Sequence, residues 1–123
     1  FSGSSSFIQR GGLAALTDPR GEQPVAALRS GLAALRSALL DGLSHMGRIE
    51  IPEADGAMYA FFRIDGEPDD MATAKTLVAD YGLGLAPGSA FGPEGEGWLR
   101  WCFAAGPDKI AVGLERLERF LKR

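Results

Sequence analysis

Apolar residues recur at every third or fourth position through one long stretch of the chain. The series consists of Val25, Leu28, Leu32, Leu35, Leu39, Leu43 and Met46. This spacing places the side chains on one face of an α-helix, and Pro24 and Gly47 suit its first turn and its end. We therefore predict a helix over residues 24–46, roughly 35 Å long at 1.5 Å per residue. In so short a chain, a helix of this length is typical of a connection between two bodies.

Shorter elements flank this helix. Residues 7–16 predict a short helix, opened by a capping box of Ser6 and Gln9. Beyond the long helix, strands are predicted over residues 48–52, 57–64, 83–86 and 98–104. Helices are predicted from Asp69 or Asp70 to Tyr81 and from Pro107 to Leu121. This order predicts an α+β fold, in which helices cover a small, mainly antiparallel sheet.

The composition is that of a soluble globular protein. The chain has 123 residues, of which 46% are hydrophobic and 24% are charged, and this length suits one domain. A net charge of −3 gives no reason to expect nucleic acid or an anionic membrane as a partner. No apolar run approaches the roughly 18 residues of a membrane-spanning helix. The single cysteine, Cys102, excludes an intrachain disulfide and favours a reducing, cytoplasmic location.

Arg100 is the first candidate for a binding residue. It lies within the apolar strand sequence Trp98-Leu-Arg-Trp-Cys-Phe-Ala104, where an arginine is costly unless a carboxylate or phosphate meets it. The planar guanidinium suits two-pronged binding of a carboxylate. From the local pattern alone, two other interpretations stay open. Arg100 is then either an edge arginine whose charged end reaches water, or an arginine paired with a carboxylate of the protein.

The other conspicuous residues indicate structure rather than chemistry. The glycine-rich segment over residues 87–97 lacks a Gly-Lys-Ser/Thr motif, so a mobile connector is the better interpretation than a phosphate site. His45 has no neighbours at metal-ligand spacing, and Cys102 is interpreted as core packing. None of the three lysines has the surroundings of a Schiff-base lysine. We therefore predict no metal site, no catalytic residue and no cofactor-binding residue in this chain.

Four motifs follow one another in a specific order. They are Gly56-Ala-Met-Tyr-Ala-Phe-Phe62, the helix end Tyr81-Gly82, Leu85-Ala-Pro-Gly-Ser-Ala-Phe-Gly92, and Glu96-Gly-Trp-Leu-Arg-Trp-Cys-Phe-Ala104. In this order they resemble the C-terminal, small domain of the class I/II aminotransferases, which are aspartate-aminotransferase-like, fold-type I enzymes dependent on pyridoxal 5′-phosphate (PLP). Residues 6–16 are similar to the family's segment just before its long interdomain helix. The resemblance covers essentially the whole chain.

The resemblance implies a division of the chain and two substrate-binding residues. Residues 1–23 match the end of the large domain, residues 24–47 the interdomain helix, and residues 48–123 the small α+β domain. Arg100 matches the family's arginine that holds the substrate α-carboxylate, and Tyr59 matches a position near the substrate entrance. The family's Schiff-base lysine, the aspartate that pairs with the pyridine nitrogen and the phosphate-binding arginine have no match in this sequence.

The resemblance also implies an activity for the parent protein. It would be an aminotransferase that moves an amino group between an amino acid and a 2-oxo acid, with PLP as cofactor, an N-terminal large domain and a homodimeric assembly. The present chain, which starts at Phe1 without a Met, would be a fragment that is inactive alone. Two alternatives stay open, because a fold does not fix a reaction. One is a ligand-sensing or interaction module, and the other is a PLP-dependent lyase or condensing enzyme.

Overall fold

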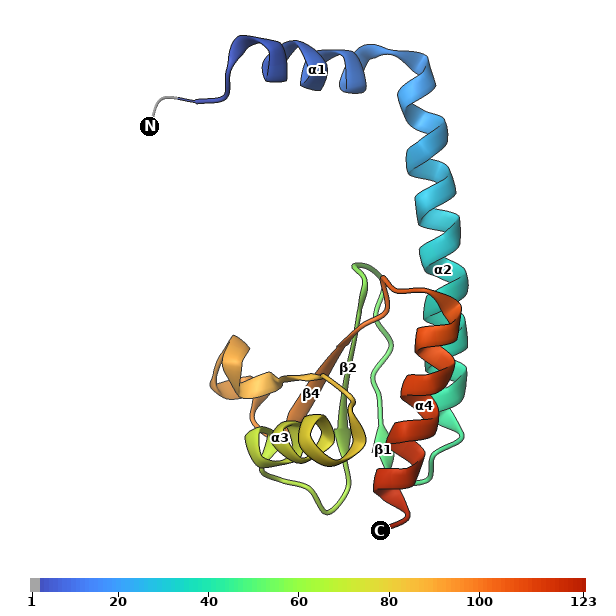
Figure 1. Cartoon of the computed structure of the whole chain (residues 1–123), viewed down its shortest axis with the longest axis vertical. Coiled ribbons are helices and arrows are strands. Elements are labelled where there is room, and N and C mark those ends of the chain that lie inside the picture. The colour runs from blue at the N-terminus through green and yellow to red at the C-terminus, as the bar shows by residue number, and fades with distance from the viewer. Residues whose placement is uncertain (1–2) are drawn as a thin grey trace. The chain divides into compact units, whose positions relative to one another are not determined.

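The longest helix, α2, runs from Glu22 to Ser44 in a computed structural model that describes residues 3–123. Its residues are divided between two units, one that ends at Gly31 and one that runs from Leu32 to Arg123 (Figure 1). The predicted long helix is therefore present, shifted by two residues towards the N-terminus. No helix in the described residues is both long and apolar enough to cross a bilayer.

In the first unit, helix α1 (Ser6–Thr17) precedes α2, and the short 3-10 helix η1 (Pro19–Gly21) joins them. The predicted capping box is wrong. Ser6 is already the first helical residue, whereas a capping side chain must stand just before the helix. The Gln9 side-chain amide does reach back, but it donates to the carbonyl oxygen of Ser4 at 2.6 Å.

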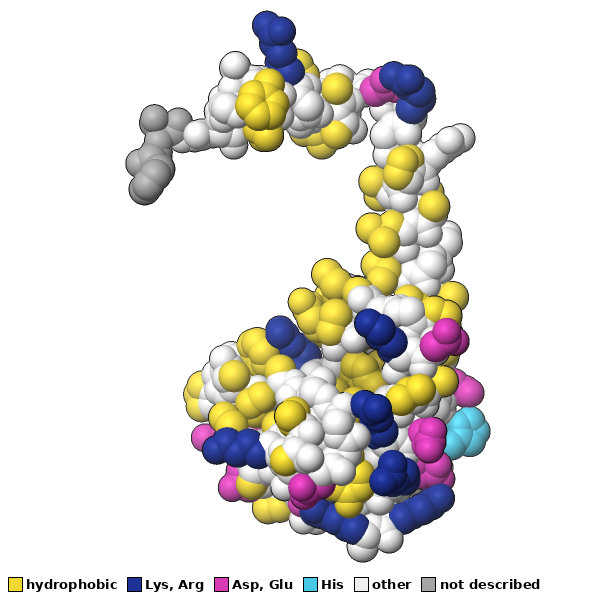
Figure 2. Space-filling model, viewed as in Figure 1, with side chains coloured by type: hydrophobic (Ala, Val, Ile, Leu, Met, Phe, Trp, Pro, Cys, Tyr) yellow, Lys and Arg dark blue, Asp and Glu magenta, His cyan; other side chains and the backbone are white. Residues whose placement is uncertain are grey.

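The apolar stripe of α2 is covered over only part of its length. Leu39 and Leu43 are fully buried in the core of the second unit. Val25 and Leu28, in the first unit, are each 64% exposed. Figure 2 shows apolar side chains along this first unit. Because these side chains are largely exposed, no described residue covers them.

We expect the 123-residue chain, when produced alone, to self-associate. Large apolar side chains that are more than half exposed gather in the first unit, namely Phe7, Ile8, Leu13, Leu16, Val25 and Leu28. So many exposed large apolar side chains on one short segment are unusual on a monomer. Sedimentation velocity at rising concentration should show oligomers, and glutamine at positions 13, 16 and 28 should restore a monomer. A monodisperse monomer of the unaltered chain at high concentration would contradict this expectation.

The second unit is built on a four-stranded antiparallel sheet in the order β1-β2-β4-β3. The strands are β1 (Ile49–Glu50), β2 (Tyr59–Ile64), β3 (Ala86–Pro87) and β4 (Trp98–Cys102). The inner strands β2 and β4 are paired from Tyr59 opposite Cys102 to Arg63 opposite Trp98. The α+β fold with a small antiparallel sheet is thus confirmed.

Three helices cover one face of this sheet. Helices α3 (Asp70–Tyr81) and α4 (Pro107–Leu121) share a core with the C-terminal part of α2 (Figure 1). Alternate residues of the inner strands enter this core, and they are Ala60, Phe62, Ile64, Leu99 and Trp101. Gly113 of α4 lies so close to the indole of Trp101 that a Cβ there would overlap the ring. The glycine therefore sets how closely α4 approaches the sheet.

The strand predicted over residues 83–86 is largely wrong. Helix α3 ends at Gly82, whose left-handed backbone (φ 66°) forms the expected cap. Leu83 and Leu85 are buried as a strand pattern requires, but only Ala86 of the predicted segment lies in β3. The two leucines therefore enter the core from an extended connection that is not part of the sheet.

Candidate functional site

The second face of the sheet carries the residues that alternate with the core positions. They are Tyr59, Phe61 and Arg63 from β2, and Trp98, Arg100 and Cys102 from β4. Each of them is half-buried or exposed. The rings of Phe61 and Trp98 are stacked with centroids 5.4 Å apart. Among the described residues, this face is an aromatic surface with two arginines rather than part of the core.

Arg100 lies at the middle of β4, an inner strand. It is opposite Phe61 of β2 on one side and Ala86 of β3 on the other, so the interpretation as an edge arginine is wrong. None of the ion pairs between residues 3 and 123 includes Arg100. The described carboxylates therefore leave its charge without a partner.

Two aromatic rings contact the guanidinium of Arg100. Its Cζ lies 4.2 Å from the ring centroid of Tyr59 and 3.7 Å from that of Phe91. Such contacts attract a cation to the face of an aromatic ring and restrict the rotation of the side chain, but they do not neutralise its charge. The structure thus brings together the two residues that the sequence singled out, Arg100 and Tyr59, and adds Phe91. The arrangement can offer a held guanidinium to a planar carboxylate.

Phe91 comes from the glycine-rich segment. This segment folds into two short 3-10 helices, η2 (Gly88–Phe91) and η3 (Pro93–Gly95), which contact each other. Gly88 and Gly95 are buried, and a Cβ on either would overlap backbone atoms of the other. The segment that the sequence indicated as a mobile connector is thus folded into two short helices packed against each other.

Asp70 holds this loop to helix α3. The helix is capped by Asp69, which accepts a hydrogen bond from the backbone N–H of Ala72 at 2.9 Å. Asp70 is instead buried, with 6% of its surface exposed, and its Oδ2 accepts a hydrogen bond from the backbone N–H of Ser89 at 2.7 Å. Sequence reasoning missed this role, although Asp70 lies one helical turn from the buried Thr73 and so on the buried face of α3.

The carboxyl of Asp70 is held in its charged form. Burial raises its pKa, but this effect is outweighed by hydrogen bonds from the backbone N–H and hydroxyl of Ser89, and from the backbone N–H groups of Gly97 and of Asp70 itself. The pKa of Asp70 consequently lies below its ordinary value. A charged acceptor thus binds the start of the glycine-rich loop through the backbone N–H of Ser89.

The remaining polar candidates do not form a site. No group of metal-ligating side chains occurs in residues 3–123. His45 is exposed and its Nδ1 lies 2.7 Å from the backbone oxygen of Asp41. Cys102 is exposed, so its interpretation as core packing is wrong. Successive side chains of a strand point to opposite faces of the sheet, so Cys102 lies on the same face as Arg100 and outside the core.

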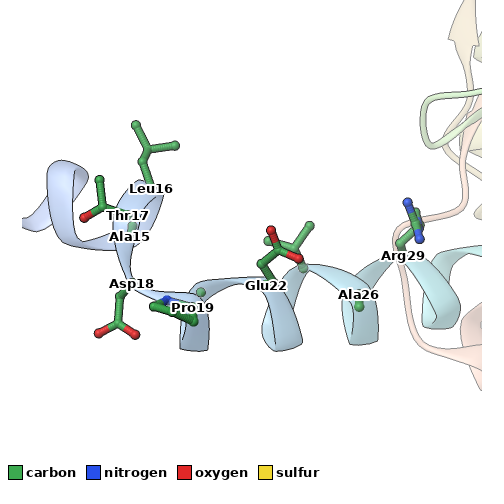
Figure 3. Close-up of a pocket in the computed structure, with 10 residues that line it drawn as sticks. Ala15, Leu16, Thr17, Asp18, Pro19, Glu22, Ala26 and Arg29 are labelled. Atoms are coloured by element: carbon green, nitrogen blue, oxygen red, sulfur yellow. The ribbon is translucent and has the colours of Figure 1, made fainter.

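The first unit has a hollow where α1 meets α2 (Figure 3). Its lining includes Leu16, Asp18, Glu22 and Val25. In Figure 3 the carboxylates of Asp18 and Glu22 point to opposite sides of the ribbon, and Asp18 is engaged by Arg20. No set of polar groups therefore converges in this hollow, and the aromatic face around Arg100 remains the candidate site.

Comparison with known proteins identifies the family. Residues 1–117 match the family model "Aminotransferase class I and II". The chain is 31% identical over 118 residues to aromatic-amino-acid aminotransferase 2 of Thermococcus litoralis and 30% identical over 118 residues to an aspartate aminotransferase of Pyrococcus abyssi, covering 95% of this chain and 30% of each relative. The crystal structure of an aromatic aminotransferase from Pyrococcus horikoshii is similar with a TM-score of 0.90 at 31% identity, over 95% of this chain and 31% of that one. The chain thus spans about 30% of the length of these relatives, and it belongs to the class I and II aminotransferase family.

Proposed function

We propose that this chain is the C-terminal part of a PLP-dependent aminotransferase, which transfers an amino group between an amino acid and a 2-oxo acid. Within it, Arg100 is the anchor for the substrate α-carboxylate. The observation that carries this proposal is the guanidinium of Arg100, held by two rings and free of any ion pair in the described residues. A half-buried arginine without a protein carboxylate is best explained by a carboxylate that arrives with the ligand.

Arg100 acts by holding and orienting the substrate. Two parallel N–H···O bonds from a planar guanidinium fix both the position and the tilt of a carboxylate. An amino acid held in this way presents its Cα–H bond and amino group in one direction, which lowers the entropic part of the barrier. Tyr59 and Phe91 keep the guanidinium in place, so less of its side-chain freedom is lost when the substrate binds.

The chain's own residues do not fit the covalent attachment of PLP. Lys75, Lys109 and Lys122 are all exposed, and Lys122 is paired with Glu118 at 2.6 Å. A lysine that attaches PLP is normally desolvated or placed beside another cation. When bound, PLP serves these enzymes as an electron sink. We therefore propose that PLP is attached to a part of the whole protein that this chain does not span. The same proposal includes a large domain and a partner subunit in a homodimer.

The activity is tested with the whole protein that carries this chain. L-aspartate and L-phenylalanine are supplied as amino donors and 2-oxoglutarate as acceptor, with PLP present, and the products are identified by mass spectrometry. The proposal expects glutamate and the 2-oxo acid of the donor in equal amounts. If elimination or condensation products form instead, the protein is a lyase or a condensing enzyme and the proposed aminotransferase activity is wrong. No turnover and no PLP binding would indicate an interaction module instead.

The isolated chain is expected to form no stoichiometric covalent complex with PLP. Its three lysines are exposed, so none lies in the enclosing pocket that stabilises such an attachment. The check is an absorbance spectrum after incubation with PLP and removal of the excess, followed by borohydride reduction and peptide mapping. A stable 1:1 product that maps to one lysine would overturn this prediction.

A further inference from the structure

Asp70 is a buried carboxylate that substrate binding by Arg100 does not use directly. It shares the buried face of α3 with Thr73, Ala74 and Leu77, where an apolar side chain would normally pack. Burying a carboxylate is unfavourable unless hydrogen bonds replace its hydration. For Asp70 the bond at 2.7 Å comes from the backbone N–H of Ser89, in the loop that carries Phe91, whereas α3 is capped by Asp69.

We propose that Asp70 is a positioning residue for the Arg100 site, an inference that rests on the proposed carboxylate-binding function. Oδ2 of Asp70 accepts the N–H of Ser89 at 2.7 Å, and Ser89 lies in η2, which ends at Phe91. The ring of Phe91 lies 3.7 Å from Cζ of Arg100. A continuous series of contacts therefore runs from the start of α3 to the guanidinium.

Burial alone does not fix Phe91. The side chain is 52% exposed, so the hydrophobic effect gives its position only part of the usual support. Its place depends on the backbone of η2, which is held to another element by the hydrogen bond that the N–H of Ser89 donates to the carboxylate of Asp70. Releasing Ser89 should therefore let Phe91 leave the guanidinium.

The charge of Asp70 is needed as well as its shape. The backbone N–H of Ser89 donates to its Oδ2 at 2.7 Å, and the Ser89 hydroxyl and the backbone N–H of Gly97 also stabilise the charged form. A carboxylate only accepts hydrogen bonds and suits such donors at both oxygens, whereas an asparagine amide presents an N–H₂ group in place of one of them. Asp70→Asn is thus nearly the same size but should loosen the loop.

Asp70→Asn in the whole protein is expected to raise KM for the amino donor about tenfold, the effect of losing a hydrogen bond to a charged group, with kcat within about twofold of the unaltered enzyme. The donor is whichever of L-aspartate and L-phenylalanine the enzyme uses. Phe91→Leu should raise KM to a similar extent. In the Phe91→Leu background, Asp70→Asn should add almost nothing, because the two residues act through the same contact.

The matched control is Asp69→Asn. This neighbouring carboxylate caps the same helix, and its side-chain hydrogen bond goes to α3. Asparagine keeps the capping oxygen, so Asp69→Asn should change the thermal stability little and leave KM unchanged. If Asp69→Asn raises KM as Asp70→Asn does, the effect comes from the helix as a whole and the proposal is wrong. The proposal is also wrong if the double variant raises KM by the product of the effects of Asp70→Asn and Phe91→Leu measured alone.

Two further variants separate the possible failures. Ser89→Pro removes the backbone N–H that donates to Asp70 without altering the buried carboxylate, and it replaces Asp70→Asn if that variant does not fold. It should raise KM about two- to threefold, as the loss of one modest hydrogen bond does, and add nothing in the Phe91→Leu background. If Arg100→Lys impairs the enzyme but Asp70→Asn and Ser89→Pro do not, only the positioning role fails. If Arg100→Lys also has no effect, the proposed function of Arg100 fails.

Discussion

Replacing Arg100 by lysine in the whole protein is expected to lower kcat/KM by about 30- to 1000-fold, which corresponds to about 2–4 kcal/mol. The substitution keeps the positive charge but removes the planar fork that binds both carboxylate oxygens. It also removes the flat surface that lies against Tyr59 and Phe91. Both binding and turnover should suffer, because a carboxylate held by a single ammonium group is free to tilt.

The measurement is steady-state kinetics, combined with a PLP titration of each variant. Arg63→Lys is the matched control, since Arg63 lies on the same face of the sheet, two positions from Phe61 in β2, but is paired with Glu50. Exposed ion pairs contribute little, so kcat/KM of Arg63→Lys should stay within about twofold. PLP affinity should be unchanged in both. Near-normal kcat/KM in Arg100→Lys, or a loss of PLP instead, would remove Arg100 as the carboxylate anchor.

The helices of this protein could be predicted from sequence because their signals are local. Pro107 opens α4 and Gly82 ends α3 at the expected positions, and the apolar period of α2 is long enough to be unambiguous. The sequence predicts its start at Pro24, whereas α2 starts at Glu22, because a proline is tolerated anywhere in the first turn, where its missing N–H has no partner to lose. The local sequence therefore predicts that the helix exists but does not predict the exact residue at which it begins.

The glycine-rich loop could not be predicted in the same way. Its two 3-10 helices exist because the backbones of Gly88 and Gly95 touch, and nothing in the local sequence indicates this contact. Phe91 could not be found for the same reason, since it lies nine positions before Arg100 and only the fold of the loop brings them together. Arg100 itself could be found because a charge within an apolar strand is conspicuous.

The role of Asp70 could be predicted from the sequence only in part. It follows another aspartate at a helix start, where acidic residues are common because they interact favourably with the helix dipole, so the sequence predicts a cap at either aspartate. The structure divides the two roles, with Asp69 as the cap and Asp70 turned into the core. The helical period that joins Asp70 to Ala74 and Leu77 contained the signal, but only the loop packed against it shows why a carboxylate is there.

Replacing Gly88 by alanine is expected to destabilise the protein by about 2–3 kcal/mol, in the range of overpacked cores, and to lower kcat/KM at the same time. A Cβ at position 88 would overlap the carbonyl oxygen of Gly95 and lie 2.9 Å from both the Cβ and the carbonyl oxygen of Trp98. Backbone atoms of a paired strand cannot move aside cheaply, so the loop must shift. Phe91 would shift with it, away from Arg100.

Gly84→Ala is the matched control, four residues earlier in the chain. Gly84 is exposed, and a Cβ there would have no atom within 4 Å, so alanine should be neutral or stabilise by up to about 1 kcal/mol through the unfolded state. The two variants are compared by calorimetry and by KM for the amino donor. If Gly88→Ala unfolds at the same temperature as the unaltered protein with an unchanged KM, the Gly88–Gly95 contact does not hold the loop. The link from the loop to Arg100 would then be lost as well, because the same backbone carries Phe91.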